Sequence, residues 1–255
     1  MFRTLLVALA VVVPAAAQDK KPTELRWYGH SMFQLTTAAG TKIVFDPHAI
    51  TEYGLPPLSP DLLLISHPHD DHNRREVLAN ADSKDLKVLQ GVSPKGKGTA
   101  TDWTKYDEKV KDVRARSVNT YHDQEEGAKR GKNAVAIVEA DGLVFCHLGD
   151  LGHELTPEQV KEIGPVDVLM IPVGGIYTIN GEMAKTVVEQ LKPKLFIVPM
   201  HYGTKVYQDL PPPDEFLDGQ KKIDRLEGSN VLTIPAGLKA ERPTVVILGW
   251  AQPKM

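Results

Sequence analysis

The stretch that decides the fold is His67-Pro68-His69-Asp70-Asp71-His72, which places three imidazoles and a well-spaced carboxylate within six residues. It follows Leu62-Leu63-Leu64-Ile65-Ser66, an apolar run with the length and flanks of a buried strand. His67 and His69 are two residues apart, so they point the same way from an extended backbone. This concentration of ligand-type residues after a strand predicts a metal site rather than a histidine-rich surface turn.

The residue types in this cluster indicate which metal it binds. Neutral imidazole nitrogen together with carboxylate oxygen suits zinc or a similar transition metal, whereas magnesium or calcium would take mostly oxygen. The turn after His69 can swing Asp71 and His72 toward a second ion. A cluster this local cannot complete two coordination spheres, and two-metal sites need a group that bridges ions about 3.5–4 Å apart. Further ligands must therefore come from later in the chain.

Three later strand-like segments each deliver a ligand-type residue at their ends. Residues 112–121 end at His122, residues 143–148 end at Gly149-Asp150, and residues 195–200 end at His201. Each signal alone is weak, because a single histidine after a strand is more often a structural residue and a Gly-Asp pair is most often a turn. Together with the first cluster, they predict one shared site.

These residues, in this order, resemble the metallo-β-lactamase superfamily through its HxHxDH motif and its later single ligands. The closer likeness within it is to the UlaG-like metal-dependent hydrolases, the branch that includes L-ascorbate-6-phosphate lactonase. The branch-level similarities are Trp27–Ser31, Val44–Pro47, His147–Asp150 and Val198–Tyr202, and the resemblance spans Glu24 to about Trp250. It implies an α/β (α+β) fold, a four-layer αββα sandwich, with hydrolysis as the chemistry.

The resemblance also implies a set of ligands and a cofactor of two divalent transition-metal ions. The ligands of the first ion would be His67, His69 and His122, those of the second Asp71, His72 and His201, and Asp150 would bridge the two. Each ion would keep room for solvent, and an open position separates a catalytic from a structural zinc site. A water shared by two cations would lose a proton near neutral pH and become the nucleophile, so Asp71 and Asp150 count as catalytic candidates. Zinc is favoured, with manganese or iron as alternatives.

For several residues besides the predicted metal ligands, the sequence allows either a functional or a structural role. His30, Tyr177 and Tyr202 are candidates to contact substrate or donate a proton, against ordinary packing or hydrogen bonding. His48 departs from the pattern of the branch; it could reach the pocket mouth, or it could be a capping or surface residue. Asp46 could accept a ring N–H from a ligating histidine and so fix its tautomer, against a turn-forming Asp-Pro pair.

The N-terminus predicts export. Arg3 precedes the apolar run Leu5–Val13, and Ala15-Ala16-Ala17 supplies the small residues of a cleavage site, so residues 1–17 read as a secretory signal peptide. The apolar run is shorter than the roughly 20 residues of a membrane span. The sequence therefore predicts a secreted or periplasmic protein, without stable membrane insertion after cleavage, whose residues 18–255 form a single domain.

The composition limits the classes of molecule that the protein is expected to bind. The formal net charge of −3 does not indicate the basic surface that nucleic-acid binding needs, so a small-molecule substrate is expected. The sequence does not determine the oligomeric state. The single cysteine, Cys146, lies in an apolar strand and is expected to pack in the core. The leading function is an exported dinuclear hydrolase of a small ester or lactone. The alternatives are a phosphodiesterase, a β-lactamase-type hydrolase and a non-enzymatic metal-binding protein.

Periodicity and capping signals place the remaining elements. Strand-rich halves, each with helices, favour two sheets packed face to face with helices outside. Helices are predicted at Asn73–Ala81, from Thr156-Pro157-Glu158 onward, at Glu182–Leu191, and between the stiff loop Pro211-Pro212-Pro213 and Leu226. Later strands are predicted at Val166–Val173, Leu195–Pro199, Val231–Ile234 and Thr244–Leu248.

Overall fold

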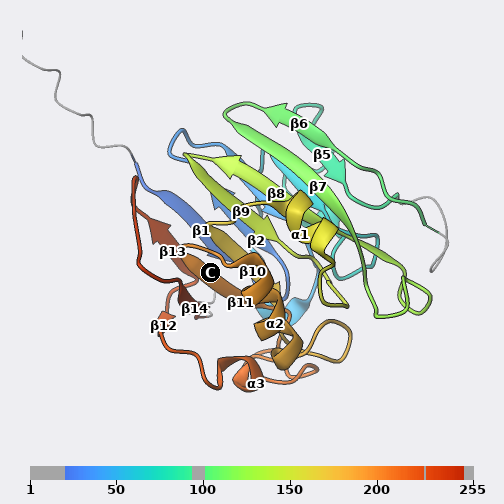
Figure 1. Cartoon of the computed structure of the whole chain (residues 1–255). Helices are drawn as coiled ribbons and strands as arrows, with labels where there is room; N and C mark the ends of the chain where they lie inside the picture. The colour runs from blue at the N-terminus through green and yellow to red at the C-terminus, as the bar shows by residue number, and fades with distance from the viewer. Residues whose placement is uncertain (1–20, 94–100, 227, 250–255) are drawn as a thin grey trace, which may run out of the picture.

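The computed structural model describes residues 21–93, 101–226 and 228–249, so the predicted signal peptide lies outside the described residues. Two sheets lie face to face, with helices on the outer side of one of them (Figure 1). Within the described ranges, no helix has the length and apolar character needed to cross a membrane. The architecture is the two-sheet sandwich of the αββα type that the sequence predicts, with its α-helical layer on the eight-stranded sheet.

Each sheet combines segments from both halves of the chain. The first has the order β13-β1-β2-β3-β4-β5, with β1 (Thr23–Trp27), β2 (Phe33–Thr36), β3 (Lys42–Phe45), β4 (Leu62–Ile65), β5 (Lys87–Gln90) and β13 (Val231–Ile234). The second has the order β12-β14-β11-β10-β9-β8-β7-β6, with β6 (Asp107–Val110), β7 (Val113–Tyr121), β8 (Lys132–Ala140), β9 (Leu143–His147), β10 (Val168–Pro172), β11 (Phe196–Met200), β12 (Ile223–Leu226) and β14 (Thr244–Leu248). β13 and β14 have the predicted bounds.

Strand β4 shows how the sequence positions the site. Its Leu62 and Leu64 lie in the core between the sheets, while Leu63 and Ile65 lie in a second cluster on the outer face. The two sets alternate because successive side chains of a strand point to opposite faces. Burial on both faces holds the strand firmly, so the loop that begins at its end starts from a fixed point. Cys146 is buried in the main core as expected, and burial raises the pKa of its thiol to about 12.

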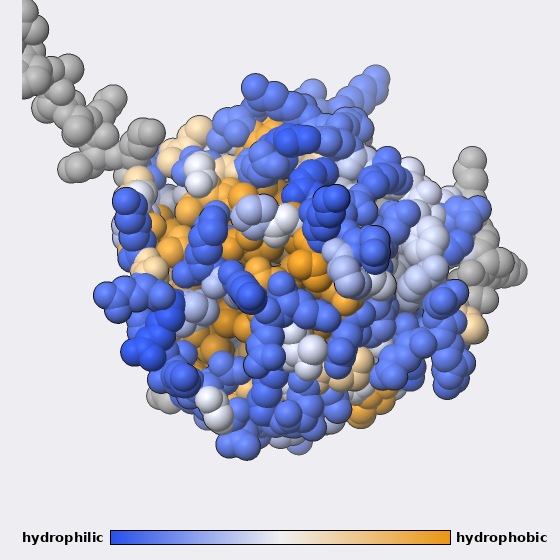
Figure 2. Space-filling model, viewed as in Figure 1, coloured by the Kyte–Doolittle hydropathy of each residue, from blue (hydrophilic) through white to orange (hydrophobic). Residues whose placement is uncertain are grey.

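The helices cover the eight-stranded sheet. Figure 1 shows α1 (Pro157–Ile163) and α2 (Gly181–Leu191) in front of it, and α3 (Asp214–Leu217) packs on α2. Helix α1 begins with the predicted cap, because the Thr156 side chain accepts a hydrogen bond from the Gln159 N–H in a capping box. Figure 2, from the same side, shows apolar surface between the polar side chains on this face.

Two predicted helices are wrong. Within Asn73–Ala81 only one 3-10 turn forms, η2 (Arg75–Val77), because Leu78 is extended and forms a β-bridge with Leu58. The outer face of the six-stranded sheet is therefore covered by loops with η1 (Thr51–Tyr53) and η2 rather than by an α-helix in the described residues.

The helix predicted to reach Leu226 is also wrong. Helix α3 has a single turn, and Gly219 follows it with a φ of 76°. The apolar residues of Ile223–Leu226 instead form β12, which pairs in parallel with β14 at the edge of the larger sheet. Pairing with β14 satisfies the backbone hydrogen bonds of this segment, and it packs against the core the same apolar side chains, Ile223 and Leu226, that suggested a helix.

Candidate metal centre

Ligand-type side chains gather where strands of both sheets end on the same side of the sandwich. The cluster that follows β4 meets single residues that follow β7, β9 and β11. The structure thus brings together all the residues that the sequence predicts as ligands, and it adds one from the β1–β2 turn, His30. The predicted ligands are His67, His69, Asp71, His72, His122, Asp150 and His201.

Asp150 lies at the centre of this cluster. Its Oδ2 atom is 3.1 Å from Nε2 of both His72 and His122, 3.3 Å from Nε2 of His201, and 3.8 Å from Nε2 of His67. The carboxylate is 1% exposed, and its other oxygen has no hydrogen-bond partner in the described part of the chain. One carboxylate oxygen therefore faces imidazoles delivered by three different loops.

Besides the group of Asp46, His67 and His72, the side chains form two groups around Asp150. The first is His67, His69 and His122, and the second is His30, Asp71, His72 and His201; in each group the ligand atoms lie within 4.8 Å of one another. The buried Nε2 atoms of His72 and His201 lie near Asp150 Oδ2, but neither forms a hydrogen bond of acceptable geometry with any described residue. Buried polar atoms without partners are unfavourable unless a ligand satisfies them, so these His/Asp clusters fit metal ions.

Burial sets the charge of the His67 and His69 imidazoles. Burial, with a contribution from neighbouring imidazoles, holds the pKa of His67 well below its usual value and lowers that of His69. Both rings are therefore neutral near pH 7, which is the state that binds metal. For Asp150, burial acts to raise the pKa, but His201 and His72 outweigh it and keep the pKa well below its usual value. The central carboxylate is ionised.

His72 behaves differently because carboxylates surround it. Burial acts to lower its pKa, but Asp150 and Asp46 outweigh burial, and the pKa lies well above its usual value. Its Nδ1 is 2.9 Å from the Asp46 carboxylate, which can only accept a hydrogen bond, so this nitrogen keeps a proton. A metal ion binding at Nε2 would displace the other proton.

Asp46 organises the residues behind the ligands. Its carboxylate accepts hydrogen bonds from the Ser66 backbone N–H at 2.7 Å, from the Ser66 hydroxyl at 2.6 Å and from His72 Nδ1. Because the hydroxyl donates to Asp46, its oxygen is free to accept from His67 Nδ1 at 2.9 Å. Both rings then direct Nε2 toward Asp150, which is the arrangement expected if Asp46 orients ligand histidines.

The backbone is unusual at this site. His30, Asp46 and His201 all have positive φ angles, 49°, 41° and 51°, in the left-handed region that side chains other than glycine seldom adopt. Gly149 has a φ of 55°, and a Cβ there would lie 2.4 Å from Asn133 Oδ1. That oxygen accepts the backbone N–H of Asp150. Backbone strain of this kind concentrates at functional sites, where the surrounding structure holds it in place.

A set of hydrogen bonds holds the loop that carries His30. The His30 carbonyl accepts the indole N–H of Trp27 at 3.0 Å and the backbone N–H of His201 at 3.1 Å. His48 is fully buried, with Nε2 3.2 Å from the carbonyl oxygens of Tyr28 and Gly29. Of the alternatives for His48, the structure supports capping of this loop and not a place at the pocket mouth.

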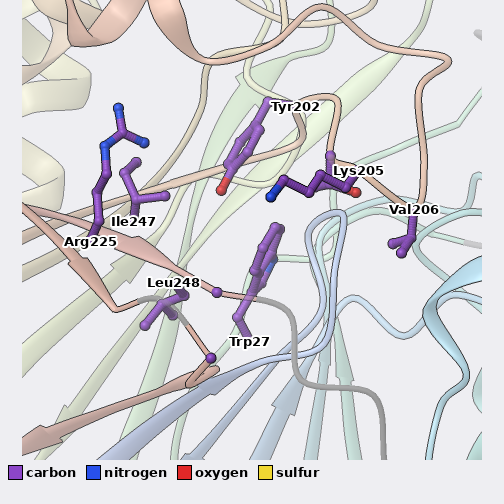
Figure 3. Close-up of a pocket in the computed structure, with 10 residues that line it drawn as sticks. Trp27, Tyr202, Lys205, Val206, Arg225, Ile247 and Leu248 are labelled. Atoms are coloured by element: carbon purple, nitrogen blue, oxygen red, sulfur yellow. The ribbon is translucent and has the colours of Figure 1, made fainter.

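Tyr202 lies away from the metal cluster. Its ring stacks on Trp27, with ring centroids 5.4 Å apart, and both line a cavity of about 420 Å³ with Lys205 and Arg225 (Figure 3). No residue of this cavity lines the smaller one at the metal cluster. The structure therefore places Tyr202 in a packing role behind the site, which corrects its assignment as a catalytic candidate.

The cavity at the cluster has a volume of about 260 Å³ and is small enough to suit a small molecule. It is lined by side chains of the loops that carry the predicted ligands and of the loop after β10, namely His69, Asp71, His122, Arg130, Asp150 and Tyr177. Tyr177, a candidate from the sequence, thus lies at the cavity.

Residues 24–201 match the family described as "Beta-lactamase superfamily domain", which accounts for more than half of the chain. The chain belongs to the metallo-β-lactamase superfamily. Among curated relatives, proteins named UPF0173 metal-dependent hydrolase are similar to it. One from Anaeromyxobacter dehalogenans is 31% identical over 216 residues, 75% of this chain and 78% of the relative. One from Lysinibacillus sphaericus is 29% identical over 234 residues, 85% of this chain and 98% of the relative.

Solved structures agree with this assignment. A Thermotoga maritima protein, proposed to be a zinc-dependent hydrolase of the metallo-β-lactamase superfamily, is 34% identical, covers 89% of this chain and 98% of its own, and has a TM-score of 0.66. A Parabacteroides distasonis protein is 22% identical over 89% of this chain and 93% of its own, with a TM-score of 0.63, which shows the fold alone. This superfamily member is accordingly a metal-dependent hydrolase.

Sequence analysis missed two features of the superfamily member's site. It assigned His30 to the pocket but not to a ligand group, although the Gly29-His30 turn between two strands was visible. It did not single out Arg130, which reaches the cavity from the loop that begins at ligand-type residue His122. A scan of charged residues in the loops that follow predicted ligands would have found it.

Proposed function

We propose that this superfamily member is a dinuclear metal-dependent hydrolase that acts on a small ester or lactone. The observation that carries the proposal is the place of Asp150, whose Oδ2 lies 3.1 Å from His122 of the first group and 3.1 Å from His72 of the second. A carboxylate shared between two imidazole groups is suited to bridge two ions. The relatives named metal-dependent hydrolases support the reaction class.

The ligand sets follow from the two groups. His67, His69 and His122 would hold the first ion, and Asp71, His72 and His201, three of the four members of the second group, would hold the second. Asp150, whose Oδ2 lies within 3.8 Å of imidazoles of both groups, would bind both ions. Imidazole-rich groups favour zinc, with manganese or iron as alternatives. When bound, such ions lower the pKa of water and polarise a substrate oxygen.

The residues of the chain supply the proton path. In ester hydrolysis the water oxygen bonds to the carbonyl carbon, the carbon–alkoxy bond breaks, and the alkoxide leaves with the electron pair and takes up a proton. Asp71 is partly exposed and lines the cavity, so its carboxylate is placed to accept the proton of the attacking water and pass it to the leaving oxygen. His30 Nε2 lies 3.6 Å from Asp71 Oδ2 and is available to exchange that proton.

The proposal is tested by metal content and turnover together. After saturation with zinc, elemental analysis should give close to two ions per chain, and a value near one would contradict the dinuclear assignment. A panel of lactones, phosphodiesters and a chromogenic β-lactam should identify lactones as the substrates that are hydrolysed.

The Asp150→Ala variant separates chemistry from folding. Turnover should fall by orders of magnitude and metal content should drop, while the circular dichroism spectrum stays that of the wild type, because the sheets hold the fold. The matched control is Asp112→Ala, which removes a carboxylate that bonds Thr37 and Thr41 at the opposite end of β7 from His122. An Asp150→Ala protein with full metal content and full turnover would overturn the assignment.

Export is the proposed setting for this activity. Its basis is the signal-peptide pattern of residues 1–17. Expression of the full chain in a Gram-negative host should give mature protein in the periplasmic fraction with Gln18 as its first residue, and retention of uncleaved protein in the cytoplasm would contradict it.

A further inference from the structure

Arg130 is a cation at the cavity beside the cluster of ligand-type side chains. It lines the same cavity as Asp71, His122 and Asp150, and it is half-buried. Its Nη2 donates a hydrogen bond to the Ile176 carbonyl at 3.1 Å, and its guanidinium carbon lies 5.7 Å from the centre of the Tyr177 ring. The guanidinium is thus held in place by a carbonyl and an aromatic face, which leaves most of its five N–H donors free.

The loop that carries Arg130 is fixed to the metal cluster. Asp123, which follows ligand-type residue His122, accepts backbone N–H groups all along this loop. They come from Glu125 at 2.8 Å, Gly127 at 2.9 Å, Lys129 at 3.0 Å and Arg130 at 2.7 Å. These bonds use the Asp123 carboxylate and set the distance between Arg130 and the cluster.

Arg130 has no ion pair with any described residue. Arg74, Arg114 and Arg116 each lie within 4 Å of a carboxylate, whereas Arg130, like Arg26 and Arg75, does not. Of these three unpaired arginines, Arg130 is the one that lines the cavity at the cluster. The nearby Glu125 is already paired with Lys129. A guanidinium held rigidly at a cavity, without a protein carboxylate, is available to bind an anion of a ligand.

We propose that Arg130 binds a carboxylate group of the substrate, so that the substrate of this site is a small carboxylate-bearing ester or lactone. The inference rests on the proposed function. One guanidinium fork matches one carboxylate in charge and in planar geometry. The charge of two bound divalent ions would exceed that of Asp71 and Asp150, which also favours an anionic substrate in this cavity.

The rim of the cavity indicates the rest of the substrate. Ile176 and Tyr177 are 50% and 51% exposed, and in the described part of the chain they are the large hydrophobic side chains with such exposure. Exposed apolar side chains beside a binding cavity commonly contact ligand. They would pack on the carbon skeleton between the carboxylate at Arg130 and the carbonyl at the ions.

The experiment compares matched lactones on the zinc-loaded protein. The probes are γ-butyrolactone, its 5-carboxylate, and the phosphate ester of its 5-hydroxymethyl derivative, with hydrolysis followed by proton release. For the 5-carboxylate, Arg130→Gln should raise KM by about 10- to 100-fold, the scale of a lost charge-assisted hydrogen bond, with little change in kcat. KM for γ-butyrolactone should not change, and Arg130→Lys should recover part of the loss.

A control and a binding measurement make the outcomes distinct. Lys129→Gln removes the neighbouring cation, which pairs with Glu125, and should leave all kinetic constants unchanged. Calorimetric titration with tetrahydrofuran-2-carboxylate, which is not hydrolysed, should show weaker binding to Arg130→Gln at unchanged zinc content. No hydrolysis of any lactone by the wild type would contradict the proposed function. Equal KM values for the neutral and carboxylated lactones would overturn anion binding by Arg130, and a preference for the phosphate ester would overturn the assignment of a carboxylate-bearing substrate.

Discussion

At the scale of single residues, the site depends on hydrogen bonds one layer behind the ligands. Asp46 fixes the proton of His72 on Nδ1 and, through Ser66, that of His67 on Nδ1. The tautomer of a histidine decides which ring nitrogen is available to a metal, so one carboxylate orients a histidine in each of the two groups. This explains why Asp46 is held by the β3–β4 pairing at a strained backbone position.

The Asp46→Ala variant should therefore bind metal more weakly without losing a ligand. We expect the affinity for zinc to fall by about 10- to 100-fold, the usual effect of removing such a partner. Competition with a chromophoric chelator measures this, and Asp112→Ala, which changes a carboxylate far from the cluster, should retain wild-type affinity. Unchanged zinc affinity in Asp46→Ala would show that His72 and His67 are oriented by other groups.

The sequence predicted the ligand-type residues, but it did not predict how the residues around them are placed. His67 to His72 could be found because ligand spacing is local, and Asp150 and His201 because strand ends converge. Tyr202 follows His201 directly, yet its side chain turns to Trp27, because the positive φ of His201 reverses the chain there. His48 could not be placed because its partners, the carbonyls of Tyr28 and Gly29, are distant in sequence.

At the scale of elements, capping signals were more reliable than periodicity. Thr156-Pro157-Glu158 predicted the start of α1 because the cap is a local interaction between the backbone and a nearby side chain. The periodic pattern of Asn73–Ala81 failed because tertiary pairing of Leu78 with Leu58 competed with the helix. Short amphipathic segments have little intrinsic helical stability, so packing decides their structure.

The α1 cap offers a test at this scale. Thr156 Oγ1 accepts the Gln159 N–H at 3.2 Å, and Gln159 Oε1 accepts the Thr156 N–H at 2.9 Å. Thr156→Ala should lower the free energy of unfolding by about 1 kcal/mol, whereas Thr156→Ser should be close to wild type. Urea denaturation measures both. Equal stability of the alanine and serine variants would mean that Pro157 and tertiary packing alone hold the start of α1.

At the scale of the whole molecule, several buried histidines make stability depend on pH. His48 is the clearest case, because burial lowers its pKa to about 4 while its ring caps the His30 loop. Between that value and about 6.5, the unfolded chain takes up a proton at this position and the folded chain does not. Stability is thus present above pH 6.5 and decreases as the pH falls toward 4.

Replacement of His48 isolates this contribution. The wild type should lose on the order of 3 kcal/mol more than His48→Gln between pH 7.5 and pH 4, because glutamine cannot take up the proton. Urea midpoints at several pH values give the comparison, and the difference between the two proteins removes the effect of the other histidines. Parallel pH profiles for the two proteins would show that His48 is protonated in the folded state.

Metal binding should add to the stability of the whole fold, because its ligands come from loops of both sheets. His67 and His72 follow β4 of one sheet, whereas His122, Asp150 and His201 follow strands of the other, so an ion at Asp150 would join the two layers. Zinc at 100 times its dissociation constant should stabilise the folded state by about 2.7 kcal/mol. For a chain of this size that corresponds to a rise in Tm of roughly 5–10 °C.

Calorimetry with and without a chelator measures this rise in Tm, with Asp150→Ala as the variant in which zinc should have a much smaller effect. A Tm that does not respond to zinc or to chelator in the wild type would contradict a metal centre that spans the sheets.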